Sequence, residues 1–389
     1  MQKNIYLYVL AALSIFIFTA GTTYLVSNFL KTKSLNPLES ITNTNTANRK
    51  SKFDSSLPRT EACPLNGALY SKPEMQAWAA RRPLAVMIEN HQDSRPASGL
   101  SSADIIYEAV AEGGITRFMG IYYCGIAGIN ETVAPVRSAR IYFTQLVPEY
   151  DALYNHVGGA GLCDDPTVDP RAKALCYIRT NKIKDMDQFG LDFKACHRVT
   201  NRLDHEVAYE HTMACYTDEL YSVAAKRGWT NIDANNNNVS WDKNFTPWKF
   251  KDESSSHGTT ADIKFDFWAS SPDYSVEWQY DGTTNSYKRN NGGVAVVDHN
   301  TGQTLLAKNV VIQFVKETGP VDEHKHMIYD TIGKGKMILF QDGQAQTGTW
   351  IKSLAASRTK FLLDSGKEVQ FNPGLIWIEL VPSANTITY

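Results

Sequence analysis

Short apolar runs alternate with charged segments between residues 84 and 136, and this alternation constrains the fold more than any other feature. The apolar runs at residues 84–88, 105–110, 118–123 and 132–136 are rich in Ile, Val, Tyr and Phe, which favour β-strands. Acidic residues and arginines fall at the ends of these runs. Because strand ends and turns display functional groups, we expect a sheet whose edge carries the chemistry.

Residues 101–124 can be interpreted in two ways. A helix would begin with the capping-box spacing that ends at Asp104 and would stop at Gly113. Alternatively, two strands meet at Gly113-Gly114, a dipeptide typical of hairpin turns. The Ile, Tyr and Phe residues in both arms favour the hairpin, which would place Asp104 and Glu108 on one face of its first strand.

The next segment predicts a strand, a short helix at about residues 138–146, and a second strand that ends near His156. Ser138 and the free amide groups at the start of this helix would form an anion site, reinforced by Arg137 and Arg140. His156 would lie at the sheet edge where ligands bind in open α/β sheets.

An uncharged stretch at residues 5–30 is long enough to cross a bilayer as a helix. We therefore predict that residues 1–32 form a single-pass signal anchor, with the globular part outside the cytoplasm; a cleaved signal peptide is the alternative. Residues 33–60 are rich in Asn, Thr and Ser and predict a disordered linker.

The remaining chain predicts two folded domains and an overall α+β class. Residues 61–228 are expected to form a mixed α/β sheet domain, and the Asn-rich residues 229–260 a linker or loop. Residues 261–389 contain short strand-like runs separated by turn signals, which predicts a β-rich barrel or sandwich. No acid or base cluster stands out there, so this domain is interpreted as a binding or spacer module.

Composition and cysteine spacing narrow the function. The net charge is −2, with no long basic block, so a nucleic-acid partner is not expected. The six cysteines contain no CxxC pair, which argues against a zinc ribbon or a thioredoxin-type site. Outside the cytoplasm, short loops would favour the disulfides Cys163–Cys176 and Cys196–Cys215; buried reduced thiols are the alternative.

Several runs in fixed order resemble a known bacterial family. They are RPLAVMIENHQDSRPASGLSSADIIYEAVAEGGITRF, PVRSARIYF, EYDALYNHVGG, KNVVIQFV, GKGKMILFQDGQAQTGTW and NPGLIWIELVP. Together they resemble the YerB-like lipoproteins, a family catalogued as domain of unknown function 3048. The resemblance implies an extracytoplasmic protein tethered at the bacterial membrane, and it implies no reaction. This chain has no lipidation cysteine before Cys63.

A second resemblance is to the LytR-CpsA-Psr phosphotransferases, which attach glycopolymers to the cell wall. Asp104 at a strand start and the arginines of APVRSAR are similar to that family's pattern. Ser138 stands where that family has an acid.

Two functional hypotheses follow, and the sequence leaves open whether the chain is an enzyme. In the first, an acid- and arginine-lined cleft binds a wall glycan, a lipid-linked glycan or an envelope protein. In the second, the chain is an envelope phosphotransferase or hydrolase acting on a phosphorylated glycan, since arginines bind phosphate in bidentate fashion. No cofactor is identified and no metal ligand set is predicted; Mg²⁺ held by Asp104 or Glu108 would belong to the second hypothesis.

The candidate residues fall into two groups. Those assigned to catalysis are Asp104, Arg137, Arg140 and His156. Those assigned to ligand binding are Glu89, Asn90, Arg95, Glu108, Glu112, Arg117 and Ser138. The tryptophans suited to sugar stacking are Trp241, Trp248, Trp268 and Trp278.

Overall fold

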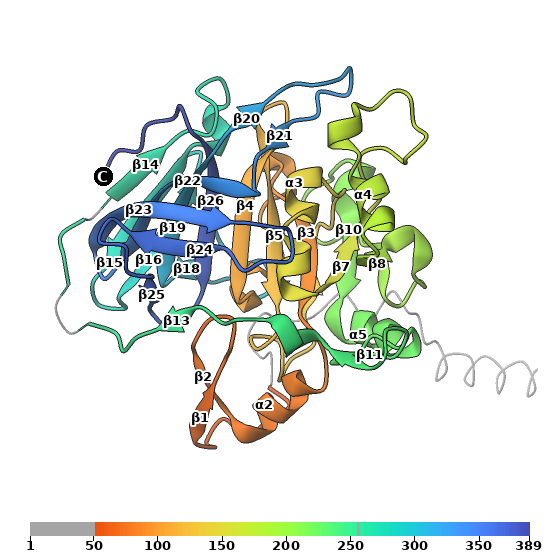
Figure 1. The fold of residues 1–389 in the computed structure, drawn as a ribbon, viewed down its shortest axis with the longest axis horizontal. Coiled ribbons are helices and arrows are strands. Elements are labelled where there is room, and N and C mark those ends of the chain that lie inside the picture. The colour runs from red at the N-terminus through yellow and green to blue at the C-terminus, as the bar shows by residue number, and fades with distance from the viewer. Residues whose placement is uncertain (1–50, 255–256, 261) are drawn as a thin grey trace, which may run out of the picture. The chain divides into compact units, whose positions relative to one another are not determined.

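The structure is a computed structural model that describes residues 51–254, 257–260 and 262–389 (Figure 1). The predicted membrane anchor at residues 1–32 and the linker up to residue 50 lie outside the described residues. Across the part of the chain that is described, no helix has the length and apolar character needed to cross a bilayer. All described residues belong to one compact unit.

A mixed ten-stranded sheet joins the two halves of the chain (Figure 1). In spatial order its strands are β24 (Lys360–Leu363), β23 (Gln344–Lys352), β22 (Gly333–Gln341), β19 (Asn309–Val315), β26 (Ile376–Pro382), β4 (Ile105–Glu112), β5 (Ile115–Tyr122), β3 (Leu84–Glu89), β7 (Leu153–His156) and β8 (Lys184–Asp187). The halves meet where β26 pairs in parallel with β4, with Glu379 opposite Glu108.

The α+β class is confirmed, but the sheet arrangement differs from expectation in one respect. We expected residues 261–389 to form their own barrel or sandwich, whereas five of their strands belong to the shared sheet. The physical reason lies in β4, which is buried along almost its whole length. A strand buried in this way is a central strand with a partner on each edge: β5 pairs with one edge of β4 and β26 with the other.

A second sheet covers part of one face of the shared sheet. Its strands are β14 (Asp262–Phe265), β15 (Val276–Asp281), β16 (Ser286–Asn291), β17 (Val294–Ala295) and β18 (Leu306–Ala307). Trp278 of β15 meets Trp377 of β26 edge to face, with ring centroids 5.2 Å apart. Both side chains are fully buried, so this contact lies in the core between the two sheets.

The hairpin predicted between residues 105 and 123 is confirmed. β4 and β5 pair antiparallel, from Ile105 opposite Ile121 to Glu112 opposite Ile115. The turn residues Gly113 and Gly114 have φ values of 60° and 81°, a region that only glycine adopts readily. A Cβ atom at Gly114 would also lie 1.9 Å from the Ser271 hydroxyl, so the turn needs glycine for two reasons.

The helices are short and lie mainly in the first half of the chain. They are α2 (Lys72–Ala79), α3 (Ile141–Thr144), α4 (Ala174–Thr180) and α5 (Thr217–Lys226). The helix predicted at residues 138–146 is shorter than expected: α3 has Arg140 as its N-cap, and a 3₁₀ turn with Pro148 follows it. Ser138 therefore does not stand at a helix start, and the helix amides expected to bind an anion beside it begin two residues later.

Small ladders complete the described unit. They are made by β1 (Arg59–Ala62), β2 (Leu69–Ser71), β6 (Thr132–Val133), β9 (Cys196–Arg198), β10 (Met213–Tyr216), β11 (Ile232–Asp233), β12 (Val239–Ser240), β13 (Lys249–Phe250), β20 (Glu317–Thr318), β21 (Ile328–Tyr329) and β25 (Gln370–Phe371). β13 lies in the expected linker 229–260 yet pairs in parallel with β25. This segment is therefore joined to the second half by main-chain hydrogen bonds.

All six cysteines are paired in three disulfides, and two of these three bonds were predicted from the sequence. Cys163–Cys176 and Cys196–Cys215 close short loops, and Cys196 lies directly opposite Cys215 across β9 and β10. The third bond, Cys63–Cys124, ties the N-terminal part of the described chain to the loop that follows β5. Such bonds are typical of proteins that fold in an oxidising compartment.

Candidate functional site

The charged strand ends predicted from the sequence gather at one edge of the sheet but form separate groups. β3 and β4 both run antiparallel to β5, and β7 is parallel to β3. Strands β3, β4 and β7 are therefore parallel to one another, and they end at Glu89, Glu112 and His156 respectively. These three residues lie at the carboxyl ends of parallel strands, here called the carboxyl edge of the sheet. Their partners differ, and the group around Glu112 borders a cavity.

Glu112 is held by two arginines. Arg117 approaches its carboxylate at 3.3 Å, and the Arg140 guanidinium forms an ion pair with the other oxygen. Burial alone would raise the pKa of Glu112, but the two guanidinium groups outweigh it and hold the pKa at about 2. Glu112 is therefore ionised at neutral pH, and it neutralises one of the two cations beside it.

Arg117 holds the Glu112 carboxylate from the buried side of the group. Its side chain is 5% exposed and donates a hydrogen bond to the Ser138 carbonyl at 2.8 Å. Burial, with the positive charge of Arg140 nearby, lowers the pKa of Arg117 to about 10, still well above neutrality. Arg140 is further anchored to the Ala139 carbonyl at 2.7 Å, so both guanidinium groups are positioned by the backbone.

A cavity of about 400 Å³, here called the Arg140 pocket, lies beside this group. Its lining is mostly polar and comes from both halves of the chain: Glu112, Ser138, Arg140, Gly159, Ala160, Gly161, Asp165, Thr167, Val168, His324 and His326. His326 is bonded to the Asp322 carboxylate at 2.8 Å, while the His324 ring lies 3.1 Å from the Thr167 hydroxyl. The pocket combines the Arg140 guanidinium, two imidazoles and two hydroxyls with the carboxylates of Glu112 and Asp165, so a polar ligand with an anionic group would bind at Arg140.

Glu89 and Arg137 form a second group. Arg137 lies 2.9 Å from one oxygen of Glu89, and His211 contacts the other at 2.7 Å. Arg137 also donates to the Glu210 carbonyl at 3.0 Å, and the His91 ring stacks on His211. Arg137 is thus directed away from Arg140, although only two residues lie between them.

Glu108 belongs to a third group, in the core between the sheets. It forms an ion pair with Arg289 and accepts a hydrogen bond from Thr116 at 2.7 Å. Arg289 also faces Glu379 at 3.9 Å. Burial and the charge of Glu108 raise the pKa of Glu379 well above its usual range, so one guanidinium is matched by one ionised carboxylate.

Asn90 and Arg95 connect this core group to the second half of the chain. The Asn90 amide donates to Thr116 and to Asn291, each at 2.7 Å. Arg95 donates to the Asn90 side chain at 3.0 Å and to the Asp273 carbonyl, with its guanidinium over the Tyr274 ring. Both predicted ligand-binding residues therefore make internal contacts.

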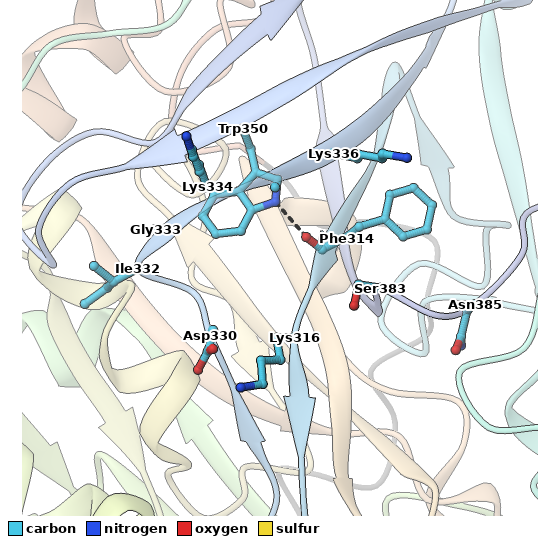
Figure 2. Close-up of a pocket in the computed structure, with 11 residues that line it drawn as sticks. Phe314, Lys316, Asp330, Ile332, Gly333, Lys334, Lys336, Trp350, Ser383 and Asn385 are labelled. Atoms are coloured by element: carbon cyan, nitrogen blue, oxygen red, sulfur yellow. Dashed lines mark hydrogen bonds between the residues drawn. The ribbon is translucent and has the colours of Figure 1, made fainter.

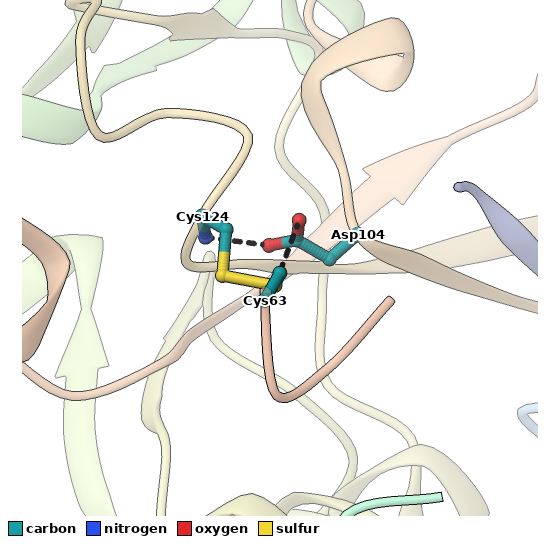
Figure 3. A group of neighbouring side chains, drawn as sticks. All are labelled: Cys63, Asp104 and Cys124. Atoms are coloured by element: carbon teal, nitrogen blue, oxygen red, sulfur yellow. Dashed lines mark hydrogen bonds between the residues drawn. A yellow bond between two sulfur atoms is a disulfide. The ribbon is translucent and has the colours of Figure 1, made fainter. Parts of the chain in front are cut away.

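Asp104 is fully buried beside the Cys63–Cys124 disulfide (Figure 3). Its carboxylate accepts hydrogen bonds from the backbone amides of residues 123–125 and from the Asn66 side chain. Burial raises the pKa of Asp104 to about 7, although the amide donors act in the opposite direction. Cys63, Asp104 and Cys124 lie close enough to surround an ion, but sulfurs in a disulfide offer no thiolate to a metal.

His156 is also fully enclosed. One ring nitrogen lies 3.0 Å from Asp185 and the other 2.8 Å from the Gly158 carbonyl. With both nitrogens engaged and no exposed surface, this ring fixes the end of β7. The structure thus brings Glu112, Arg117, Ser138 and Arg140 together and leaves Asp104, Arg137 and His156 elsewhere.

Sequence reasoning missed a second cavity at the same edge, here called the lysine pocket (Figure 2). It has a volume of about 600 Å³ and is lined by Phe314, Lys316, Asp330, Ile332, Gly333, Lys334, Gly335, Lys336, Trp350, Ser383 and Asn385. The Gly-Lys-Gly-Lys run at residues 333–336 carried a signal for it, because alternate residues of a strand face one side.

Of the tryptophans expected to stack on sugars, Trp241, Trp248 and Trp278 are buried in the core.

Comparison with known proteins finds a family model that matches each half of this chain. Residues 69–230 match the family described as "Protein of unknown function (DUF3048) N-terminal domain", and residues 263–378 match its C-terminal domain. The chain therefore belongs to this family, and the resemblance inferred from the sequence is confirmed.

The chain is similar in both sequence and structure to one protein from Bacillus subtilis. The chain is 30% identical over 310 residues to "Putative lipoprotein YerB" of strain 168, which covers 79% of this chain and 83% of the relative. The crystal structure of the Bacillus subtilis YerB protein superposes with a TM-score of 0.68 at 27% identity, covering 85% of this chain and all of that one.

Proposed function

We propose that this chain is a membrane-tethered, extracytoplasmic protein of the bacterial cell envelope that binds an anionic group of a wall or lipid-linked glycan in the Arg140 pocket. The relative's name, "Putative lipoprotein YerB", supports the location. Three disulfides support an oxidising compartment. The uncharged residues 5–30 would provide the membrane attachment.

The observation that carries this proposal is the excess of positive over negative charge around the Glu112 carboxylate. Two guanidinium groups meet a single carboxylate, so one positive charge is left without a matching negative charge. Arg140 lines the open pocket and is 11% exposed. A phosphate or carboxylate entering the pocket would supply the missing charge, and the planar guanidinium binds both groups with paired hydrogen bonds.

The phosphotransferase alternative rests on different residues from those expected. Asp104 and His156 are enclosed and bonded elsewhere, but Asp165 and His324 line the same pocket as Arg140 and would supply an acid and a base. Mg²⁺ fits poorly at Glu112, because two arginines already surround that carboxylate and repel a cation.

The test is binding of the full-length chain, in mild detergent, to isolated cell wall and to inorganic phosphate. We expect Arg140→Gln to weaken both interactions by about tenfold or more, since a charged hydrogen-bonded contact contributes about 1.5–3 kcal/mol. The matched control is Arg179→Gln on α4, an exposed arginine outside the pocket, which should leave binding unchanged.

The same experiment separates the alternatives. Arg137→Gln should also leave binding unchanged, because Arg137 is paired with Glu89. Equal binding by the wild type and Arg140→Gln would refute the proposal. Release or transfer of phosphate from a phosphorylated glycan, abolished by His324→Gln, would favour the enzyme.

A further inference from the structure

The lysine pocket lies where two neighbouring strands of the shared sheet separate (Figure 2). β19 and β22 are paired from Val310–Phe340 to Gln313–Met337, and the pairing stops there. Beyond that point the Trp350 indole donates a hydrogen bond to the Phe314 carbonyl at 2.7 Å. This contact replaces a ladder hydrogen bond and gives the cavity a fixed floor.

Gly335 allows the indole to lie across the strand. It stands directly opposite Trp350 in the β22–β23 pairing, and a Cβ atom there would lie 2.6 Å from the indole nitrogen. That separation is far below van der Waals contact. The glycines of the Gly-Lys-Gly-Lys run therefore leave room for the indole on one side of β22, and the alternating residues Lys334 and Lys336 start on its other side; all four residues border the cavity.

The rim carries an excess of positive charge. Lys316, Lys334 and Lys336 are exposed and line the cavity with one acid, Asp330, a balance of three positive charges against one negative. Among the described residues, none of the three ammonium groups forms an ion pair, in contrast to Lys264, Lys308 and Lys352 elsewhere in the second half of the chain. The three lysine side chains lie on different sides of the cavity (Figure 2), and an anion that entered it would be attracted by each of them.

The two cavities are neighbours on the carboxyl edge of the sheet. β19, β26 and β4 are adjacent and parallel, with Ile312 opposite Glu379 and Glu379 opposite Glu108. Four residues further along these three strand directions stand Lys316, Ser383 and Glu112. Ser383 lines the lysine pocket and Glu112 lines the Arg140 pocket, so the two linings begin about one strand spacing, or about 5 Å, apart. Lys316 stands about two spacings, or about 10 Å, from Glu112.

One segment also lines both cavities. Residues 316–330 leave β19, form the β20–β21 ladder and return to β22. Lys316 and Asp330 at the base of this excursion line the lysine pocket, and His324 and His326 near its tip line the Arg140 pocket. No described acidic side chain other than Asp330, Glu112 and Asp165 lines either cavity.

We propose that the lysine pocket is a second anion site, and that it and the Arg140 pocket hold successive charged groups of one linear polyanion, such as a phosphate-bearing envelope polymer. This inference rests on the proposed function and defines its ligand as a chain with repeating charges. Two linked contacts raise the overall affinity above that of either one, because the second binding step is intramolecular. The ligand therefore needs to be long as well as charged.

The test compares orthophosphate with long-chain inorganic polyphosphate by calorimetric titration of the full-length chain at fixed ionic strength. We expect the wild type to bind the polymer about 100-fold more tightly than orthophosphate. The double variant Lys334→Gln/Lys336→Gln should lose at least tenfold of the polymer affinity. The matched control, Lys194→Gln/Lys226→Gln, removes two exposed lysines from the helical part of the chain and should behave as the wild type.

The outcomes separate this inference from the proposed function. Unchanged polymer binding in Lys334→Gln/Lys336→Gln, with a loss in Arg140→Gln, would overturn the lysine site and leave the Arg140 pocket standing. A loss in the lysine variant, with none in Arg140→Gln, would overturn the shared ligand and the proposed function. An equal loss in the lysine control would show that only net charge matters and would also refute the site. Lys334 and Lys336 are exposed, so an unchanged melting temperature checks that the variant is folded.

Discussion

Arg289 in β16 and Glu108 in β4 form an ion pair in which both side chains are completely buried. The Arg289 guanidinium also lies over the rings of Trp278 and Trp377, 5.3 and 4.9 Å from their centroids. Residues 181 positions apart in the chain are thereby joined in the core. The charged face of β4 that the sequence suggested as a site is therefore part of the contact between the two sheets.

Replacing Arg289 should severely destabilise the protein. In Arg289→Met, Glu108 would remain buried without its cation, which costs about 3–5 kcal/mol. The free energy of unfolding in urea measures the effect. Lys288→Met is the matched control, because the neighbouring Lys288 is 46% exposed and pairs with Asp281 at the surface, a contribution below about 1 kcal/mol. A loss below about 1 kcal/mol in Arg289→Met would contradict the assigned role.

Asp104 should make stability depend on pH. Its pKa is raised in the folded state to about 7, whereas an unfolded Asp titrates near 3.9. The folded state then holds a proton that the unfolded state has lost, so this contribution is fully present below about pH 4 and is lost as pH rises to about 7. Over this pH range the raised pKa of Asp104 lowers the free energy of unfolding by about 4 kcal/mol in total.

Asp104→Asn tests this dependence. The variant should be less stable at every pH, because both carboxyl oxygens of Asp104 accept hydrogen bonds and an amide nitrogen accepts none. Its unfolding free energy should nevertheless fall less between pH 4 and 7 than that of the wild type. Asp252→Asn, at an exposed position, should follow the wild-type profile; a parallel profile for Asp104→Asn would contradict the raised pKa.

Glu112 should have the opposite dependence. Its pKa is lowered to about 2, so its contribution is present above about pH 4.5 and is lost as pH falls toward 2. Glu112→Gln should lower stability at pH 7 by about 3 kcal/mol, because two largely buried guanidinium groups lose their counterion. Millimolar phosphate should raise the melting temperature of Glu112→Gln more than that of the wild type or of Glu206→Gln, an exposed control. Equal shifts in all three proteins would argue against anion binding at Arg140.

The disulfides should differ in their contribution to stability. The Cys63–Cys124 bond spans 61 residues, against 19 for Cys196–Cys215 and 13 for Cys163–Cys176. On the loop-entropy estimate, replacing each pair by serine should cost about 4, 3 and 3 kcal/mol respectively. Peptide mapping without reduction should recover these three pairs. Recovery of any other pairing would contradict the fold around Asp104, which depends on the first bond.

Local patterns in the sequence predicted the strands near residues 84–136 and the Gly113-Gly114 hairpin. Alternating apolar residues and turn glycines act within a few positions, so a single sequence contains this information. The short-loop disulfides were predictable for the same reason. The Cys63–Cys124 pair was not, because its cysteines meet only after β5 has been added to the sheet.

The grouping of charges was decided by tertiary structure alone. The sequence established which acids and arginines stand at strand ends, and thus that the carboxyl edge would be charged. It could not determine that Arg140 would meet Glu112 while Arg137 met Glu89, or that Lys316 would lie beside Lys334 and Lys336. Those partners depend on which strands become neighbours, and long-range strand pairing is set by how the whole core packs, since a side chain's own sequence neighbours do not specify what it faces across a sheet.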